Sequence, residues 1–200
     1  FAMFFIGRPL LKRFMPVLEK LDEITEGETA VFFFALLVSA LATELIGIHA
    51  IFGAFLLGVI IPHDSRVASE LNKRVGDLVR IVFLPTFFAF TGMRTEIGLL
   101  TSMHDWLLCL GIIAIATIGK WGGSTLAARF TGMNWRDSSA LGILMNTRGL
   151  VELIVLNIGL DMGVIGIRLF TMLVVMALVT TFLTSPVLHW ILKDEIPVKA

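Results

Sequence analysis

A short polar run inside an apolar segment contains the residues of this sequence that are best suited to bind an ion or to act on a substrate. The run holds Asn146, Thr147, Arg148, Gly149 and Glu152. A charged side chain at the centre of a bilayer costs roughly 2.5 to 3.5 kcal/mol on insertion scales, so such residues are rare and typically functional. Arg148 and Glu152 stand four positions apart, a spacing at which they could simply pair along one helix face. An ion pathway and a local ion pair both remain open from these residues alone.

A second buried charge is expected at Lys120, which follows Gly119 in the apolar segment 105–130. A lysine near the end of a span can extend its amine to the interface, but Lys120 lies near mid-depth, which favours an ion pair with an acid. No acid of this sequence is an obvious partner. We therefore expect the partner carboxylate upstream of residue 1. We interpret Gly119 and Gly149 as helix-breaking positions, where freed backbone groups could face an ion.

The remaining polar residues of the apolar segments give weaker signals. Glu44 lies near one end of its segment, where it can be hydrated, and is a candidate for the outer mouth of a pathway; the adjoining His49 could instead bond to the backbone of a turn. The single cysteine, Cys109, rules out an intrachain disulfide framework. The other histidines have no ligand spacing, and we expect neither a metal site nor a cofactor.

Composition and charge assign the class of protein. Hydrophobic residues make up 56% of the chain and charged residues only 16%, with a mean hydropathy of +0.90, whereas soluble domains are about 25% charged. The sequence therefore predicts an all-α polytopic membrane protein. Sixteen basic and sixteen acidic residues balance, so nothing in the net charge favours a nucleic-acid partner.

Segments of about 20 apolar residues, the length needed to cross a bilayer, organise the chain. We predict six complete transmembrane helices, at 29–46, 47–62, 78–98, 105–130, 139–160 and 166–192. Residues 1–28 are interpreted as the end of a preceding transmembrane helix and a cytoplasmic linker, so that the chain is a fragment. Gly47 predicts a tight hairpin, and 66–80 a short interfacial helix. Small residues repeat every four positions after Ala50 and after Gly119, which predicts close helix packing within the chain.

The basic residues are distributed unequally between the two sets of connections. Arg94 and Arg168 alone lie on one side, and the other side holds Arg8, Lys12, Arg13, Lys20, Arg66, Lys73, Arg74, Arg80, Arg129, Arg136, Lys193 and Lys199. Cytoplasmic loops carry the excess of Lys and Arg. This places the C-terminal tail, 193–200, in the cytoplasm.

Three motifs, in this order, resemble one known family. They are 46–58 (IGIHAIFGAFLLG), 91–96 (TGMRTE) and 145–153 (MNTRGLVEL). Together they resemble the monovalent cation:proton antiporters of the second group, which include plant cation/H+ exchangers and bacterial potassium efflux systems. The third motif is most similar to the plant exchanger branch, and the likeness covers nearly the whole chain.

The resemblance implies the second half of an inverted-repeat, sodium/proton-antiporter-like fold with a broken crossover helix. By this likeness, 29–98 would form helices of the dimerisation part, giving a homodimer, and 105–192 helices of the ion-transporting core. Lys120 matches a core lysine that pairs with an aspartate of the ion site. Asn146 to Glu152 match the crossover region, where Arg148 and Glu152 would stabilise the break and Asn146 and Thr147 would offer oxygens near the ion.

The function that follows is exchange of a monovalent cation, K+ or Na+, for protons across a membrane, with membrane lipids as surroundings. A carboxylate would bind either a proton or a cation, and Lys120 would hold that carboxylate when the site is empty. The alternative is a membrane-embedded enzyme in which the two cations bind a lipid-like anionic substrate. No nucleophile or metal-binding acids accompany them in the spans. A purely structural subunit would explain close packing but not two mid-span cations.

Overall fold

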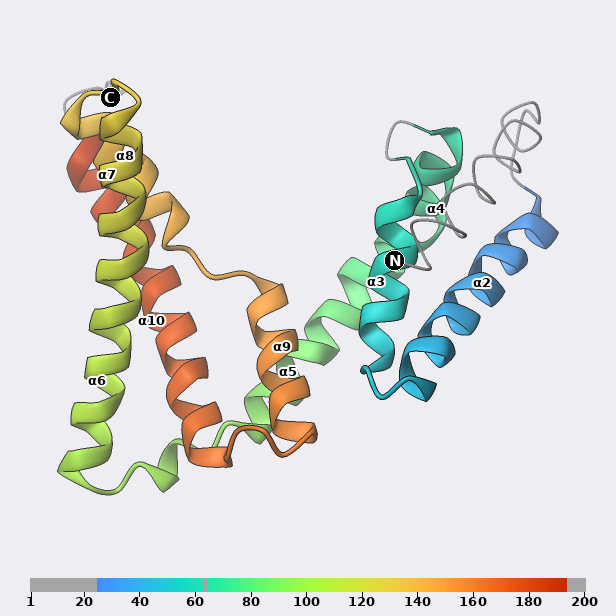
Figure 1. The fold of residues 1–200 in the computed structure, drawn as a ribbon, viewed down its shortest axis with the longest axis horizontal. Helices are drawn as coiled ribbons and strands as arrows, with labels where there is room; N and C mark the ends of the chain where they lie inside the picture. Colours follow the sequence, from blue (N-terminus) through green and yellow to red (C-terminus); the bar gives the residue numbers. More distant parts are fainter. Residues whose placement is uncertain (1–24, 63–64, 194–200) are drawn as a thin grey trace. The chain divides into compact units, whose positions relative to one another are not determined.

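A computed structural model describes residues 25–62 and 65–193, and these residues form helices and turns without a β-strand (Figure 1). Five of the described helical segments are long and apolar enough to cross a membrane: Gly27–Leu45, Ala68–Leu99, Met103–Phe130, Trp135–Asp161 and Ile167–Leu192. The predicted all-helical, multi-pass class is therefore confirmed. The preceding transmembrane helix expected within 1–28 and the tail at 193–200 fall almost wholly outside the described residues. The chain divides between Phe88 and Ala89 into two compact units.

The first unit contains a helical hairpin of α2 (Glu26–Leu45) and α3 (Ala50–Ile60). The turn between them uses Gly47 at φ 87°, a backbone conformation that glycine adopts without strain. His49 caps α3, and Pro62 follows its end. With 11 residues, α3 is about 16 Å long at 1.5 Å per residue, against a hydrocarbon core of about 30 Å. The predicted span at 47–62 is thus a short helix, and five crossings rather than six are found among the described residues.

Close packing in the hairpin occurs at Gly53. A Cβ atom there would lie 2.1 Å from the carbonyl oxygen of Ser39 and 2.5 Å from Thr43 Oγ1. The Ser39 hydroxyl donates to the Gly53 carbonyl at 2.6 Å. By contrast, a Cβ at Gly58 would meet nothing within 4 Å. The predicted small-residue repeat from Ala50 therefore missed the glycine at which α2 and α3 actually meet.

The segment after the hairpin begins with a polar helix, as the sequence predicted for 66–80. This helix, α4 (Arg66–Leu78), starts after Ser65, whose hydroxyl accepts from the Ala68 amide at 3.2 Å. It continues through a π-helical turn, η2 (Val79–Phe83), into α5 (Leu84–Arg94). The short 3-10 helix η3 (Ile97–Leu99) follows. The predicted span at 78–98 thus forms the later part of a longer helical segment, Ala68–Leu99.

The second unit is arranged around α10 (Ile167–Leu192), which packs against three other helical elements. These are α6 (Met103–Thr117), α8 (Trp135–Met145) and α9 (Leu150–Asp161). A π-helical turn, η4 (Ile118–Gly122), joins α6 to α7 (Gly123–Phe130). Figure 1 shows α10, in red, beside α6 and α8. Fully buried side chains such as Phe170 and Ile143 form the core between these helices.

Gly142 allows α8 to lie directly against η4 and α7. A Cβ at this position would come within 2.2 Å of Thr125 Oγ1 and 2.7 Å of the Trp121 carbonyl oxygen. Cβ atoms at Gly119 and Gly123 would meet nothing within 4 Å. The predicted packing repeat that begins at Gly119 is therefore wrong within the described residues, because these small residues face away from the helices that the structure describes.

Candidate functional site

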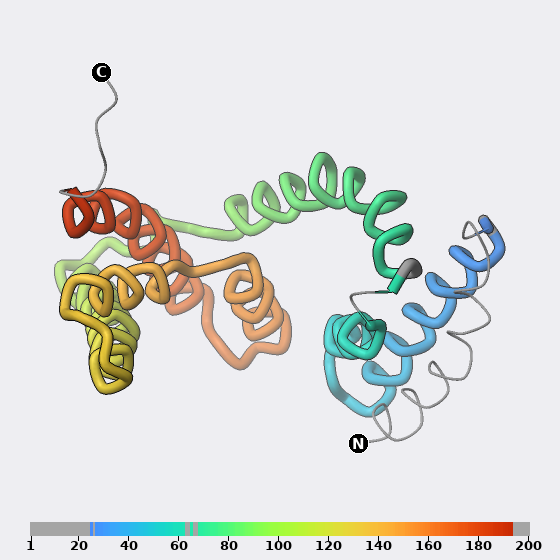
Figure 2. The backbone as a smooth tube through the Cα atoms, turned by 90° about the horizontal axis from the view of Figure 1, so that it is seen from above, coloured from blue at the N-terminus to red at the C-terminus, as the bar shows by residue number. Residues whose placement is uncertain are grey.

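The membrane span Trp135–Asp161 is interrupted in its middle. Helix α8 ends at Met145 and α9 begins at Leu150, and Figure 2 shows an extended connection between the two helices. Asn146 is the C-terminal cap of α8, and its backbone N–H donates to the carbonyls of Gly142 and Ile143. Gly149 precedes α9 in an extended conformation, at φ −104° and ψ −179°. The interruption leaves the backbone N–H groups of 147–149 without the i to i−4 hydrogen bonds of a continuous helix.

Threonines of α10 supply partners for this connection. The Thr181 hydroxyl accepts from the Arg148 backbone amide at 3.2 Å, and its one proton can be shared between the Arg148 carbonyl at 3.2 Å and the Ala177 carbonyl of its own helix at 2.8 Å. The Thr147 and Thr184 hydroxyls are 3.2 Å apart. Sequence reasoning missed Thr181 and Thr184. The signal that could have found them is three hydroxyls within five positions of an otherwise apolar span, at 180, 181 and 184.

Asn146 differs from its neighbours because its side chain has no partner among the described residues. The residue is fully buried, and neither its amide nitrogen nor its amide oxygen makes a hydrogen bond. An unsatisfied buried polar group costs about 1–3 kcal/mol, and such a group in a folded protein calls for an explanation. The Nε of Arg148 is also buried without a partner. Both orphaned groups lie within the connection from α8 to α9.

Arg148 and Glu152 form an ion pair between Nη1 and Oε1. Their side chains are only 11% and 23% exposed, so both charges are largely removed from solvent. The local pairing left open by the sequence is therefore present. Glu152 lies in the first turn of α9, where the positive end of the helix dipole also favours a carboxylate. The pair thus connects the interrupted segment to the start of α9.

Lys120 lies in η4, where the helix widens into a π-helical turn instead of breaking at Gly119. Such turns within α-helices occur often at functional sites. Lys120 is exposed, and no carboxylate of residues 25–62 or 65–193 pairs with it. Nor does any hydrogen bond join it to the cluster at Asn146 to Glu152 within those residues. The structure therefore brings Arg148 and Glu152 together but leaves Lys120 separate from them.

A cavity of about 440 Å³ lies next to this turn. Its lining includes Trp121 and Ser139, joined by a hydrogen bond of 3.2 Å from the indole nitrogen to the hydroxyl. Thr117 and Thr125 also line it, and their hydroxyl oxygens are buried without partners in the described part of the chain. The cavity is thus an apolar hollow with several polar atoms, and Lys120 is not among the residues that line it.

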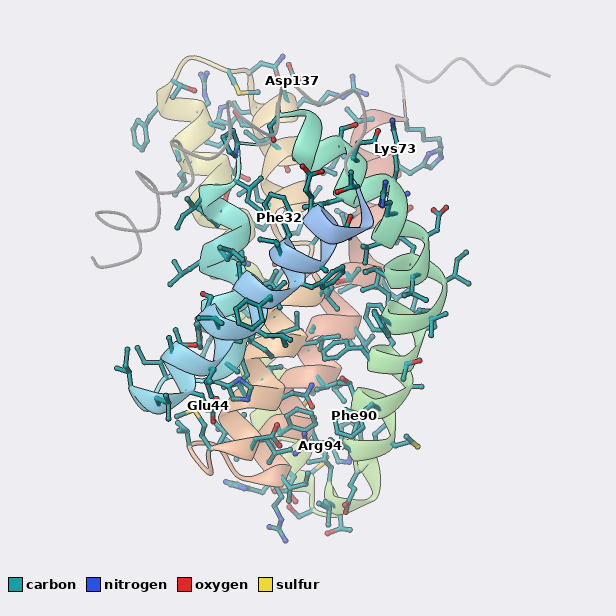
Figure 3. All side chains as sticks on the ribbon, turned by 90° about the vertical axis from the view of Figure 1, so that its right-hand side faces the viewer. Phe32, Glu44, Lys73, Phe90, Arg94 and Asp137 are labelled. Carbon is teal, nitrogen blue, oxygen red and sulfur yellow. The ribbon has the colours of Figure 1, made fainter. Side chains whose placement is uncertain are left out.

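Glu44 belongs to the first unit and has a structural contact of its own. Its Oε2 accepts from the Ala50 amide at 2.8 Å, and His49 Nδ1 accepts from the Ile51 amide at 3.4 Å. These contacts cap α3, and Figure 3 labels Glu44 near the end of α2. Within the described ranges, no group of three or more His, Cys, Asp or Glu side chains could hold a metal ion.

Replacing Thr181 with valine is expected to destabilise the protein by about 1–3 kcal/mol, the cost of leaving a buried polar group unpaired. Valine has the same shape but would leave the Arg148 amide and carbonyl without their partner. Thermal unfolding of the purified protein measures the effect. Thr180→Val is the matched control, because the Thr180 hydroxyl donates only to carbonyls of its own helix. Equal losses of stability in Thr181→Val and Thr180→Val would contradict the role of Thr181 in holding the connection from α8 to α9.

Comparison with known proteins gives a consistent set of relatives. The family model described as "Sodium/hydrogen exchanger, transmembrane" matches residues 1–194. The chain is 40% identical to the Na+/H+ antiporter NhaS4 of Synechocystis sp. over 90% of its length and 44% of that protein. It is 40% identical to K+/H+ antiporter 1 of Saccharomyces cerevisiae, over 81% of the chain and 19% of that protein. It is 43% identical to cation/H+ antiporter 17 of Arabidopsis thaliana, over 78% of the chain and 19% of that protein. The chain thus spans less than half the length of these relatives.

Proposed function

Because the chain belongs to the transmembrane sodium/hydrogen exchanger family, we propose that it forms part of a protein that exchanges K+ or Na+ for protons across a membrane. The family match and antiporter relatives at about 40% identity confirm the family resemblance of the three motifs. The matched relatives include both a Na+/H+ and a K+/H+ antiporter. Both cations are therefore candidates for the transported ion.

The interrupted span is the observation that supports this function most directly. Interrupted helices place free backbone groups and polar side chains at mid-membrane, where transporters bind ions. Here the interruption lies between Met145 and Leu150, next to the unpartnered amide of Asn146 and the Arg148–Glu152 pair. In the proposed site, Asn146 and Thr147 offer oxygens near the cation. Arg148, Glu152 and Thr181 hold the interrupted backbone in place.

Lys120 is proposed to pair with an acid that lies outside residues 1–200. Its exposure and its lack of a carboxylate partner in the described residues support this role. The acid would bind a cation or a proton in turn, and Lys120 would neutralise it when the site is empty. The hollow lined by Thr117, Trp121 and Thr125 lies on the neighbouring surface. We propose that the helix carrying the acid packs near this surface.

The architecture proposed for the whole protein is an inverted-repeat fold in which this chain supplies the second half. Helices of 29–98 would belong to a dimerisation part of a homodimer, and helices of 105–192 to the ion-transporting core. The excess of basic residues near 66–80, 129–136 and 193–199 supports a cytoplasmic C-terminus. Glu44 is proposed at the outer mouth, in addition to its capping contact.

Proton/cation exchange in membrane vesicles tests this function. The full-length protein is expressed in cells that lack their own exchangers, and everted vesicles are energised to an acidic interior. Addition of K+ or Na+ should release the pH gradient in vesicles with the protein, and not in vesicles from cells with an empty vector. If neither cation releases the gradient although the protein is present in the membrane, the exchange function is wrong. No contact described above specifically favours the alternative of an enzyme acting on a lipid-like anion.

A further inference from the structure

Arg94, the last residue of α5, binds two side chains of α9 at once. Its Nη1 donates to Asn157 Oδ1 at 3.1 Å, and its Nη2 lies 2.5 Å from Asp161 Oδ1. Asn157 and Asp161 are four positions apart, so they lie on the same face of α9. One planar guanidinium therefore spans a full turn of the helix. A contact of this kind fixes both the rotation of α9 about its axis and its position along that axis.

The contact has a buried part and an exposed part. The Asn157 amide donates to Thr91 Oγ1 at 3.0 Å and to the Leu153 carbonyl at 2.9 Å. Thr91 is 2% and Asn157 6% exposed. The Arg94 guanidinium also lies 5.2 Å from the centre of the Phe90 ring, and Figure 3 labels both residues on α5. Asp161 lies at the more exposed end, with 49% of its side chain accessible.

The ion pair with Arg94 offsets an unfavourable position of the Asp161 carboxylate in α9. Asp161 is the last residue of the helix, where the negative end of the helix dipole disfavours a carboxylate. Glu152, in the first turn, is at the favoured end. Asp161, at the disfavoured end, forms its ion pair with an arginine of another helix, Arg94 of α5.

The two arginine contacts hold opposite faces of α9. At about 100° per residue, Asn157 and Asp161 lie about 140° and 180° around the helix from Glu152. Arg148 binds Glu152 on one face, and Arg94 binds the other two on the opposite face. A rotation of α9 that preserved one contact would weaken the other. The orientation of α9 at Arg94 is therefore linked to the geometry of the interruption.

We propose that Arg94, with Asn157 and Asp161, is a positioning contact that orients α9 and thereby sets the Arg148–Glu152 pair at the interrupted helix. This inference rests on the proposed exchange function, to which it adds a residue outside the interruption. Arg94 is a positioning residue because it acts through α9 and not on the ion. Its effect should reach exchange only through the orientation of Glu152.

Variants that remove or swap the charges of Arg94 and Asp161 test the proposal in the full-length protein. Arg94→Ala and Asp161→Ala are each expected to lower the maximal exchange rate about tenfold, within the usual range of energies for coupled residues. Arg94→Lys should retain only part of the rate, since a lysine cannot bind both acceptors as a fork. The double variant Arg94→Asp/Asp161→Arg should recover most of the wild-type exchange rate, because it restores the ion pair between α5 and α9 with its charges swapped. Lys73→Ala is the control, since Lys73 also pairs with a carboxylate, on α4, at 2.6 Å.

Two results would overturn the proposal. The first is a rate for Arg94→Ala equal to that of Lys73→Ala. The second is a double variant whose exchange rate is no higher than those of the single variants.

Thermal unfolding of the same proteins gives a readout that does not depend on exchange. The losses from Arg94→Ala and Glu152→Gln should be non-additive if both contacts act on α9, and additive losses would reject the coupling. Absence of exchange in the wild type, with the coupling intact, would count against the proposed function alone.

Discussion

Replacement of Arg148 by alanine is expected to destabilise the protein by about 3–5 kcal/mol, the typical effect of removing one partner of a buried ion pair. The substitution would leave the Glu152 carboxylate, which is only 23% exposed, without its cation. It would also remove a charge from the segment that joins α8 to α9. Exchange should be lost together with stability. The midpoint of thermal unfolding in detergent and the rate of exchange in proteoliposomes measure the two effects.

The double variant Arg148→Ala/Glu152→Ala separates the ion pair from other roles of Arg148. Removing both charges leaves no unpaired ion, so the double variant should be more stable than Arg148→Ala alone. If the pair is only structural, recovery of stability should bring recovery of exchange. We expect stability to recover while exchange stays low, because the interruption and the start of α9 have lost their charges. If the double variant were as unstable as Arg148→Ala, the unpaired Glu152 carboxylate would not be the cause of the destabilisation.

Replacement of Lys120 by alanine is expected to lower exchange by roughly tenfold or more, a loss that corresponds to about 1.4 kcal/mol. The stability of the protein should change far less than in Arg148→Ala. The reason is that Lys120 is exposed and has no ion pair within residues 25–62 and 65–193. In the full-length protein its proposed partner is the acid of the ion site. Cation-dependent release of a pH gradient, normalised to the amount of protein in the vesicles, measures the effect.

Arg129→Ala is a suitable control for Lys120→Ala. Arg129 belongs to the same span, but its guanidinium donates to the Met133 carbonyl at 2.7 Å and lies over the Trp135 ring. These contacts lie at the end of α7, outside the polar interruption. The Arg129→Ala variant should therefore keep most of the exchange activity. Full exchange in Lys120→Ala would show that this lysine has no part in the mechanism.

Local patterns in the sequence were sufficient to predict much of the fold. Apolar length predicted the long helices, and the polar segment at 66–80 predicted the helix that became α4. The spacing of Arg148 and Glu152 was sufficient to propose their pairing, because both partners lie on neighbouring turns. Such features depend on residues close together in the chain.

Features that depend on a distant partner could not be predicted in the same way. Gly53 and Gly142 are required by the backbone and side chains of neighbouring helices, which the repeat of small residues does not reveal. The Thr181 contact with Arg148 joins residues 33 positions apart. The sequence placed Arg94 among the few basic residues of one side and in the 91–96 motif, but it did not reveal that Arg94 binds Asn157 and Asp161 of α9. The span at 47–62 was predicted from hydropathy alone, whereas the caps at His49 and after Ile60 shorten the helix.

Asn146 offers the most direct test of the claim that the interrupted helix binds the transported cation. Its side chain is fully buried and has no hydrogen-bond partner in the described residues. If the amide were only structural, Asn146→Leu should be tolerated, since an apolar side chain of similar size removes an unsatisfied polar group. If the amide oxygen binds the ion, the substitution should weaken binding without loss of stability.

The measurement is the concentration of K+ or Na+ that gives half-maximal exchange, for wild type and Asn146→Leu in proteoliposomes. We predict a rise of about tenfold or more for the transported cation, the equivalent of about 1.4 kcal/mol, with an unchanged midpoint of thermal unfolding. An unchanged half-maximal concentration in the folded variant would contradict the assignment of the ion site to the interruption between α8 and α9.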